Sequence, residues 1–468
     1  MSNETTQRYP FALVTLTTLF FMWGFITCLN DILIPYLKEI FELTHFQSNL
    51  VQLAFFLAYF IISLFYFVVS AAIGDPIMKI GYKNTIVLGL IISAIACFLF
   101  FLEASSEAPA FSKFLLALFL LGSGFTFLQI AANPLVAVLG TPETSSSRLN
   151  LSQAFNSLGT TLAPIIGGYF IFEYFDADTQ GATEVQIPYL FLTSILLILA
   201  GVIFMANIPN VQIEGNLDFK NTAKAGALKY PHLVFGMFAI FCYVGAEVAI
   251  GSNLVGYMEG EHNFTKETAS QLLSFYWGGA MIGRFMGALS MSQLPTFKKR
   301  VLMAIAAVLT FLLIFFITYD KLSGTIKYKD FFYYIGFLVL NYFMFIWAKS
   351  KPSNTLGLFA IVNICLIIFT LIFSREFSLW CILSVGLFNS IMFSNIFTLA
   401  IDRLGKYTSQ GSSLLVMMIL GGAVVPPIQG MVADYFGVQL AFIVPMICYA
   451  YLVWYGFKGC NIRRSKSC

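Results

Sequence analysis

The stretch NTIVLGLIISAIACFLFFL, residues 84–102, contains no charged residue and decides the class of fold. An α-helix rises about 1.5 Å per residue, so an apolar run of about 20 residues can cross the hydrocarbon core of a bilayer. Comparable runs recur along the chain. We predict fourteen membrane-spanning helices, near residues 11–29, 48–73, 84–102, 114–139, 149–172, 187–207, 232–257, 268–291, 301–319, 331–348, 355–374, 378–400, 410–432 and 438–457.

The composition supports an all-α polytopic membrane protein. Of 468 residues, 59% are hydrophobic and 10% are charged, whereas a soluble domain carries about a quarter charged residues. Strands of an outer-membrane barrel would alternate in polarity, which these unbroken apolar runs do not. A net charge of +3, with no basic run interleaved with aromatic residues, predicts no nucleic-acid partner. The eight cysteines lack CxxC spacing, so we expect free thiols and no metal site.

The distribution of Lys and Arg residues tests the predicted number of spans. With a cytoplasmic N-terminus and alternating loops, 18 of the 26 basic residues fall on the cytoplasmic side. Cytoplasmic loops of membrane proteins carry such an excess. Residues 1–10 lack the basic region and cleavage site of a signal peptide, so the first run is expected to stay as a helix. We predict a multi-pass protein of the plasma membrane (the inner membrane of a Gram-negative cell) with both termini cytoplasmic.

The longest polar connection, residues 208–230, suggests how the chain is divided. It follows the sixth span, so residues 1–207 are predicted to form an N-terminal six-helix bundle and 208–230 a cytoplasmic linker. Residues 231–468 are then a second bundle with two extra helices. Two bundles with a substrate site between them at mid-membrane depth are a common transporter plan.

The two extra helices are predicted at about 331–374. The simplest account is a peripheral pair packed outside the second bundle. Its main polar residues are Asn341 and Asn363 in an otherwise Tyr-, Phe- and Leu-rich segment, so we expect the pair to face lipid. An accessory role and a partner-binding surface both remain open.

Three ionisable residues lie within or at the end of predicted spans, where charge is expensive and often functional. Asp31 stands at the outer end of the first span, Glu247 lies deep in the seventh, and Arg284 lies in the eighth. The carboxylates are candidates for binding a coupling cation. Asp31 could instead be an interfacial carboxylate at a helix end, and Glu247 could pair with Arg284 for a structural reason alone. The guanidinium of Arg284 could also donate to a sugar hydroxyl.

Amide side chains form stripes on several predicted helices. Members of a stripe are spaced three or four apart, which puts them on one face. An amide both donates and accepts hydrogen bonds, which suits a polyhydroxylated ligand, although amides also join neighbouring membrane helices. The two stripes are Gln129 with Asn133, and Asn150 with Gln153 and Asn156; further amides within later spans are Asn389, Asn395 and Gln429.

Several motifs in one order resemble a known family. They include WGFITCLNDILIP (23–35), LQIAANPLVAVLG (128–140), RLNLSQAFNSLG (148–159), GAEVAIGSNLVGY (245–257), WGGAMIGRF (277–285), GLFNSIMF (386–393) and LLVMMILGGAVVPPIQGMVADYFG (414–437). They resemble the fucose–proton symporter family of the major facilitator superfamily, and within it the bacterial glucose/galactose transporters. The resemblance covers nearly all of residues 11–457 apart from the extra pair.

The resemblance implies alternating access by two six-helix bundles around a sugar. Asp31 matches an Asp that proton-coupled fucose members use in the first helix, while Gln129 replaces their Glu in the fourth. Glu247 matches a Glu that glucose/galactose-type members carry in the seventh helix. Asp31 and Glu247 are therefore the expected ion-coupling pair, with Na⁺ at either of them as an alternative to H⁺.

The predicted function is a cation-coupled symporter, driven by H⁺ or Na⁺, that imports a hexose such as glucose, galactose or fucose. It needs no other cofactor, and we expect a monomer whose partners are the sugar and membrane lipid. The residues expected to bind the sugar are Asn30, Gln129, Asn133, Gln153, Asn156, Arg284 and Asn389.

Three other functions are weighed against symport. A sugar sensor with a transporter fold would need a broken coupling site or an added signalling domain. A transporter of a non-sugar solute stays open, because fold alone does not determine cargo. A membrane enzyme is not expected, because His45, His232 and His262 lie at loops or span ends and form no cluster with carboxylates.

Overall fold

The structure, a computed structural model, describes residues 10–41, 45–106, 109–168, 186–206, 208, 224–322, 328–373 and 376–462, and its regular secondary structure in these ranges is helical. In chain order its helices are α1 (Pro10–Ile40), α2 (His45–Ile73), α3 (Pro76–Ile80), α4 (Tyr82–Ala104), α5 (Phe111–Val138), α6 (Ser145–Gly168), α7 (Gln186–Met205), α8 (Pro231–His262), α9 (Lys266–Ser290), α10 (Thr296–Leu322), α11 (Phe331–Trp347), α12 (Pro352–Ile372), α13 (Glu376–Asn389), α14 (Met392–Ile401), α15 (Thr408–Met417), α16 (Gly421–Phe436) and α17 (Ile443–Phe457).

Each predicted span coincides with a helix or with two consecutive helices, such as α13 and α14. Within the described part of the chain, eleven helical segments are long and apolar enough to cross a membrane. The long helices α6 and α9 are not among them, because both carry polar residues along their length. The predicted all-α polytopic fold is confirmed.

The chain folds into two compact units. Unit 1 comprises Met1–Pro142, Leu158–Lys229 and Arg403–Met417; unit 2 comprises Glu143–Ser157, Tyr230–Asp402 and Met418–Cys468. Most of the predicted linker, residues 208–230, lies outside the described residues. The division into two consecutive bundles therefore stays a prediction.

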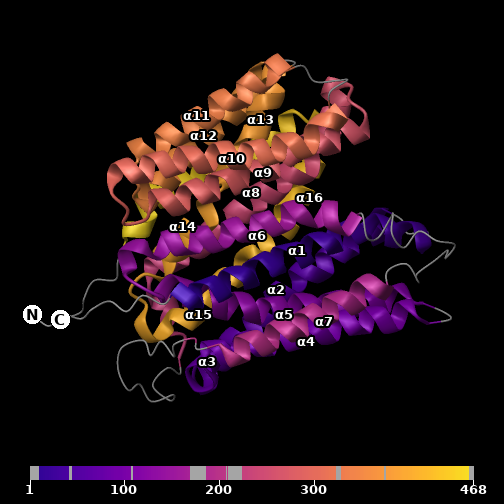
Figure 1. Ribbon diagram of the computed structural model, residues 1–468, viewed down its shortest axis with the longest axis vertical. Coiled ribbons are helices and arrows are strands. Elements are labelled where there is room, and N and C mark those ends of the chain that lie inside the picture. The colour runs from indigo at the N-terminus through magenta and orange to yellow at the C-terminus, as the bar shows by residue number, and fades with distance from the viewer. Residues whose placement is uncertain are drawn as a thin grey trace, which may run out of the picture. The chain divides into compact units, whose positions relative to one another are not determined.

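Unit 1 is built around α4 and α5. These helices lie side by side, α7 packs on α4, and α2 packs on α5 (Figure 1). The rings of Phe100 and Tyr189 stack at a centroid distance of 4.2 Å and join α4 to α7. Gly89 on α4 and Gly124 on α5 allow these two helices to lie close together, because a Cβ on either glycine would meet the backbone carbonyl of the other.

A buried carboxyl that sequence reasoning missed lies between α2 and α3. Asp75 caps α3 by accepting a hydrogen bond from the N–H of Ile77 at 3.1 Å, and it also accepts one from the hydroxyl of Tyr66. Burial raises the pKa of Asp75, while bonds from Tyr66, Ile77 and Ser409 oppose that shift. The carboxyl thus holds the turn that connects α2 to α4.

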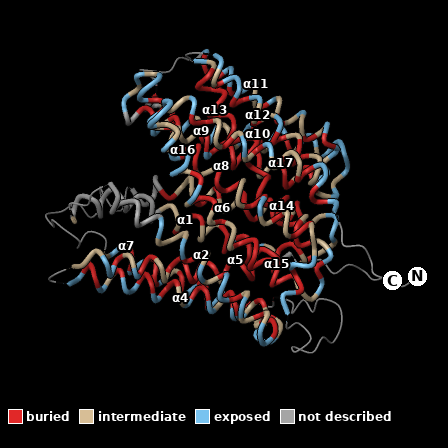
Figure 2. Tube along the Cα trace, turned by 180° about the vertical axis from the view of Figure 1, so that it is seen from behind, coloured by how far each residue is buried: buried red, intermediate tan, exposed pale blue. Residues whose placement is uncertain are grey.

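Unit 2 has α13 and α14 at its centre. All but three residues of Glu376–Ile401 are buried, whereas only four residues of Thr296–Tyr319 on α10 are buried. Figure 2 shows buried residues along α14 and exposed ones over much of α10 and α11. α9 and α12 both pack against α13, and α12 also packs against α17. A Cβ at Gly386 would meet the backbone carbonyl of Tyr276, so glycine permits the close crossing of α13 and α9.

The two amides of the predicted extra pair, Asn341 and Asn363, do not face lipid, although the same helices expose apolar residues such as Phe343 and Ile372. Both amide side chains are completely buried. Asn341 Nδ2 donates to the carbonyl of Leu387 at 3.1 Å, and Asn363 Nδ2 donates to Asn389 Oδ1 at 2.9 Å. Each amide therefore attaches its helix to α13, because an amide facing hydrocarbon would lose its hydrogen bonds.

Candidate functional site

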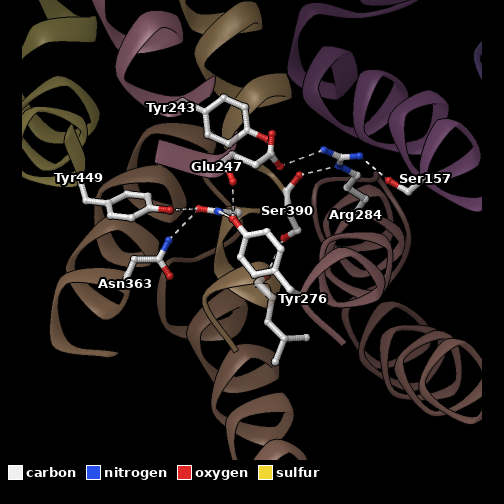
Figure 3. A network of polar contacts seen from close by, with 10 residues as sticks. Ser157, Tyr243, Glu247, Tyr276, Arg284, Asn363, Ser390 and Tyr449 are labelled. Carbon is white, nitrogen blue, oxygen red and sulfur yellow. Dashed lines mark hydrogen bonds and ion pairs between the residues drawn. The ribbon is translucent and has the colours of Figure 1, made fainter. Parts of the chain in front are cut away.

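Glu247 is the central acidic residue of unit 2. It lies on α8, and its side chain is 13% exposed. The hydroxyl of Tyr243, four residues earlier and on the same helix face, donates to Glu247 Oε1 at 2.7 Å (Figure 3). Within the described residues, no group bonds to the second carboxylate oxygen, Oε2. One oxygen of this carboxylate is therefore held in place and the other is available.

Arg284 on α9 faces Glu247 but is held mainly by other groups. Its Nη2 lies 3.7 Å from Glu247 Oε1, which is longer than a direct hydrogen bond. Its Nε donates to the backbone carbonyl of Ser390 at 3.0 Å, and its Nη1 donates to the hydroxyl of Ser157 (Figure 3). The planar guanidinium thus connects α9 with α6 and with the segment between α13 and α14. It places a positive charge beside the carboxylate without closing a tight ion pair.

A second network supports the backbone of Glu247. Asn389 Oδ1 accepts hydrogen bonds from Tyr449 at 2.6 Å and from Asn363 at 2.9 Å, while its Nδ2 donates to the hydroxyl of Tyr276 at 3.0 Å. The hydroxyl of Tyr276 donates to the carbonyl of Glu247 at 2.9 Å (Figure 3). In the described structure, both ends of the Asn389 amide are therefore bonded to protein groups. The network links α12, α13 and α17 to Glu247.

Replacing Asn389 by leucine is expected to destabilise unit 2. The substitution leaves the polar groups of Tyr276, Asn363 and Tyr449 buried without this partner, and each unpaired buried group costs about 1–3 kcal/mol. We expect a clear fall in the melting temperature of the detergent-solubilised protein. The matched control is Asn253→Leu, because Asn253 bonds only to the Ala249 carbonyl of its own helix among the described residues. Equal melting temperatures for the two variants would contradict a supporting role for Asn389.

Two of the predicted sugar-binding amides lie on α5 in unit 1. Gln129 is 3% exposed and Asn133 is fully buried. Both amide atoms of Asn133 lack a hydrogen-bond partner in the described part of the chain. A buried amide without partners is costly. A bound polar ligand that bonds to Asn133 would therefore explain why this side chain is buried.

The predicted amide stripe on α6 has two different environments. Gln153 is buried and lies one helical turn before Ser157, the residue that contacts Arg284. Asn150 Nδ2 instead donates to Asn395 Oδ1 at 3.4 Å. The geometry therefore indicates that Asn150 and Asn395 join two helices, α6 and α14. Asn156 is half-buried, and its polar groups are not without a partner in the protein.

The first-helix candidates, Asn30 and Asp31, fall within α1, but their side chains lie outside the described residues.

Several residues of the site were not predicted. Tyr243 could have been found, since it lies four residues before Glu247. Ser157, Tyr276 and Tyr449 carry no comparable signal, because their partners lie far away in the sequence.

Comparison with known proteins finds a matching family model and several similar sequences. Residues 13–350 match the family model of the Major Facilitator Superfamily. The chain is 41% identical over 461 residues to a glucose/galactose transporter of Brucella abortus, covering 98% of this chain and 96% of that protein. A putative glucose/galactose transporter of Helicobacter pylori is 38% identical, with 96% of each chain covered. The L-fucose-proton symporter of Escherichia coli is 29% identical over 94% of this chain and 91% of its own.

A solved structure shows a similar fold. The crystal structure of the transporter FucP in the outward conformation matches with a TM-score of 0.76 and 28% sequence identity. The match covers 96% of this chain and 99% of FucP. The arrangement of helices thus agrees with that of a solved transporter over nearly the whole chain.

Proposed function

The chain belongs to the Major Facilitator Superfamily, and from this membership we propose that it is a proton-coupled symporter that imports a hexose of the glucose, galactose or fucose type. The observation that carries the proposal is the carboxylate of Glu247, with one oxygen held by Tyr243 and the other open, beside a guanidinium that is positioned by other groups. Relatives named for sugar transport cover almost the whole chain.

The chemistry of Glu247 suits a site that exchanges a proton. When Glu247 is ionised, it attracts the guanidinium of Arg284 at 3.7 Å. A proton on the open oxygen removes that attraction, which leaves the Nη2 group of Arg284 free to donate to a sugar hydroxyl, while Nε and Nη1 stay on Ser390 and Ser157. Binding of the proton and binding of the sugar would then favour each other, as symport requires. Asp31 is the second coupling carboxylate in this proposal.

A proton is favoured over Na⁺ at Glu247 because a proton needs only one oxygen atom. A metal cation needs several oxygen ligands, and at Glu247 one carboxylate oxygen is already held by Tyr243. No group of three or more potential metal-binding His, Cys, Asp or Glu side chains occurs in the described ranges. Two relatives, from Escherichia coli and Haemophilus influenzae, are named L-fucose-proton symporters.

Sugar recognition is assigned to the buried and half-buried amides. Gln129 and Asn133 on α5 are buried, and Asn133 has no protein partner among the described residues. Gln153 and Asn156 lie on α6 near Ser157. Each amide can donate to one hydroxyl of a sugar and accept from another. The protein would act as a monomer in the plasma membrane, with both termini in the cytoplasm.

The test is uptake of labelled glucose, galactose and fucose into proteoliposomes with an imposed H⁺ or Na⁺ gradient. We expect a pH gradient, acidic outside, to drive concentrative uptake of at least one sugar. Stimulation by Na⁺ alone would overturn the assignment of the proton. Uptake of none of the three sugars with either gradient would overturn sugar symport as a whole.

A further inference from the structure

Helices α10 and α11 form a pair without a counterpart among the described helices of unit 1. In unit 1, α2 packs on α5, and α4 packs on α5 and α7; in unit 2, α9 packs on α13, and α12 packs on α13 and α17. The two patterns correspond only if α10 and α11 are left out. The hydroxyls of Ser290, at the end of α9, and Ser350, just before α12, lie 2.6 Å apart. The chain therefore leaves the bundle and returns to it at one point. This observation favours residues 296–347, and not the predicted 331–374, as the extra pair of helices.

The end of this hairpin near Ser290 and Ser350 is strongly basic. Its sequence segments, 290–300 and 345–356, contain no Asp or Glu. None of their cations forms an ion pair with a described residue, and all are exposed except one that is half-buried. We name this set the hairpin basic cluster; its members are Lys298, Lys299, Arg300, Lys349 and Lys351.

The local backbone brings the two basic segments together. The hydroxyl of Tyr342 on α11 donates to the carbonyl of Arg300 on α10 at 3.3 Å. Lys349 and Ser350 both adopt left-handed conformations, with φ of 55° and 52°, in the short connection between α11 and α12. Residues other than glycine rarely do so. In this turn Ser350 lies between Lys349 and Lys351, and its hydroxyl lies 2.6 Å from that of Ser290, which shortly precedes α10.

Two large aromatic side chains flank the cluster. Phe297 is 81% exposed and Trp347 is 68% exposed. Aromatic residues gather at membrane–water interfaces, and clustered cations beside a membrane helix attract anionic lipids. We propose that the hairpin basic cluster binds the phosphate headgroup of an anionic phospholipid, with Phe297 and Trp347 against its acyl chains. No acidic side chain of the described residues pairs with this positive charge, and apolar surface lies next to it, which matches a lipid better than a soluble anion.

The hairpin connects this lipid site to the backbone around the functional site. The hydroxyl of Tyr334 donates to the carbonyl of Phe275, which directly precedes Tyr276, at 2.8 Å. Asn341 Nδ2 donates to the carbonyl of Leu387, which also accepts a bond from the hydroxyl of Ser390 at 2.7 Å. A lipid that holds the hairpin in place therefore also restrains α9 and α13. Bound anionic lipid is expected to raise the melting temperature of the protein.

The experiment is lipid binding by the purified full-length chain in detergent, with phosphatidylglycerol and phosphatidylcholine as the probes. Native mass spectrometry reports how much of each lipid is retained. We expect preferential retention of phosphatidylglycerol, and Lys349→Gln/Lys351→Gln should weaken its binding about fivefold for each cation removed. A second variant, Lys298→Gln/Arg300→Gln, should give a similar loss. The control Lys224→Gln/Lys229→Gln removes two exposed cations of unit 1 and should change binding less than about twofold.

Two results would overturn the lipid site. The first is retention of phosphatidylglycerol by both cluster variants at the wild-type level. The second is full displacement of the lipid by glycerol phosphate at equal concentration, which would identify a site for a soluble phosphate. A melting temperature that rises with phosphatidylglycerol in the wild type and in the Lys224→Gln/Lys229→Gln control, but not in the cluster variants, would support the proposal independently of any transport assay.

Discussion

Replacing Glu247 by glutamine is expected to abolish proton-driven accumulation of sugar while leaving sugar exchange across the membrane. Glutamine keeps the size of the side chain and can still accept the hydrogen bond from Tyr243, but it cannot gain or lose a proton. With one proton per sugar, a pH gradient of one unit supports about tenfold accumulation. We expect this ratio to fall to one in Glu247→Gln, measured as gradient-driven uptake, with counterflow of labelled sugar retained.

The control for Glu247→Gln is the same substitution at Glu259, which is exposed near the end of the same helix. Glu259→Gln should accumulate sugar as the wild type does. Full accumulation in Glu247→Gln would remove this residue from the coupling mechanism. Loss of counterflow as well would instead assign Glu247 to sugar binding, because exchange needs binding and translocation but no net proton movement.

Replacing Arg284 by glutamine is expected to reduce transport by roughly 100-fold and to destabilise the protein. The change removes donors to the Ser390 carbonyl and the Ser157 hydroxyl and takes away the positive charge beside Glu247. Hydrogen bonds from charged groups contribute about 1.5–3 kcal/mol each, and a carboxylate left without its counter-charge adds to the cost. Transport rates and melting temperatures of the purified variant measure the two effects.

Two further variants separate a structural role of Arg284 from a functional one. Arg284→Lys retains the charge, but a single ammonium cannot reproduce the planar fork that meets Ser157 and Ser390 together, so transport should stay low. The double variant Glu247→Gln/Arg284→Gln removes both charges and should recover the part of the lost stability that comes from the unpaired carboxylate, but not the part that comes from the bonds to Ser157 and Ser390. If it also recovered concentrative uptake, the pair would be purely structural and the coupling proposal would fail.

The membrane spans could be predicted because their signal is local. A run such as residues 84–102 is apolar enough by itself to require a bilayer, and no distant residue changes that. The resemblance to the major facilitator superfamily was also readable from short motifs, and the family match confirms it. Glu247 and Arg284 stood out for the same reason, since a charged residue in an apolar run is visible without knowing its neighbours.

The roles of neutral polar residues could not be predicted in this way. Asn363 lies in an apolar segment and was assigned to a lipid-facing helix, yet it is fully buried against Asn389. Asn150 and Gln153 have the same helical spacing as a ligand-binding stripe, but Asn150 bonds to Asn395 on another helix. Spacing determines which helix face carries an amide, whereas the packing of helices determines what that face meets.

The apolar run at residues 84–102 and its counterparts determined by themselves that this chain spans a membrane as a bundle of helices, because the cost of exposing apolar surface to water is a property of each segment. Tertiary structure alone decided that the Arg284 guanidinium is held by Ser157 and Ser390, and that Asn389 links three helices to Glu247. These contacts join residues up to 127 positions apart. Hydrogen bonds depend on distances of a few tenths of an ångström, which only the packed helices set.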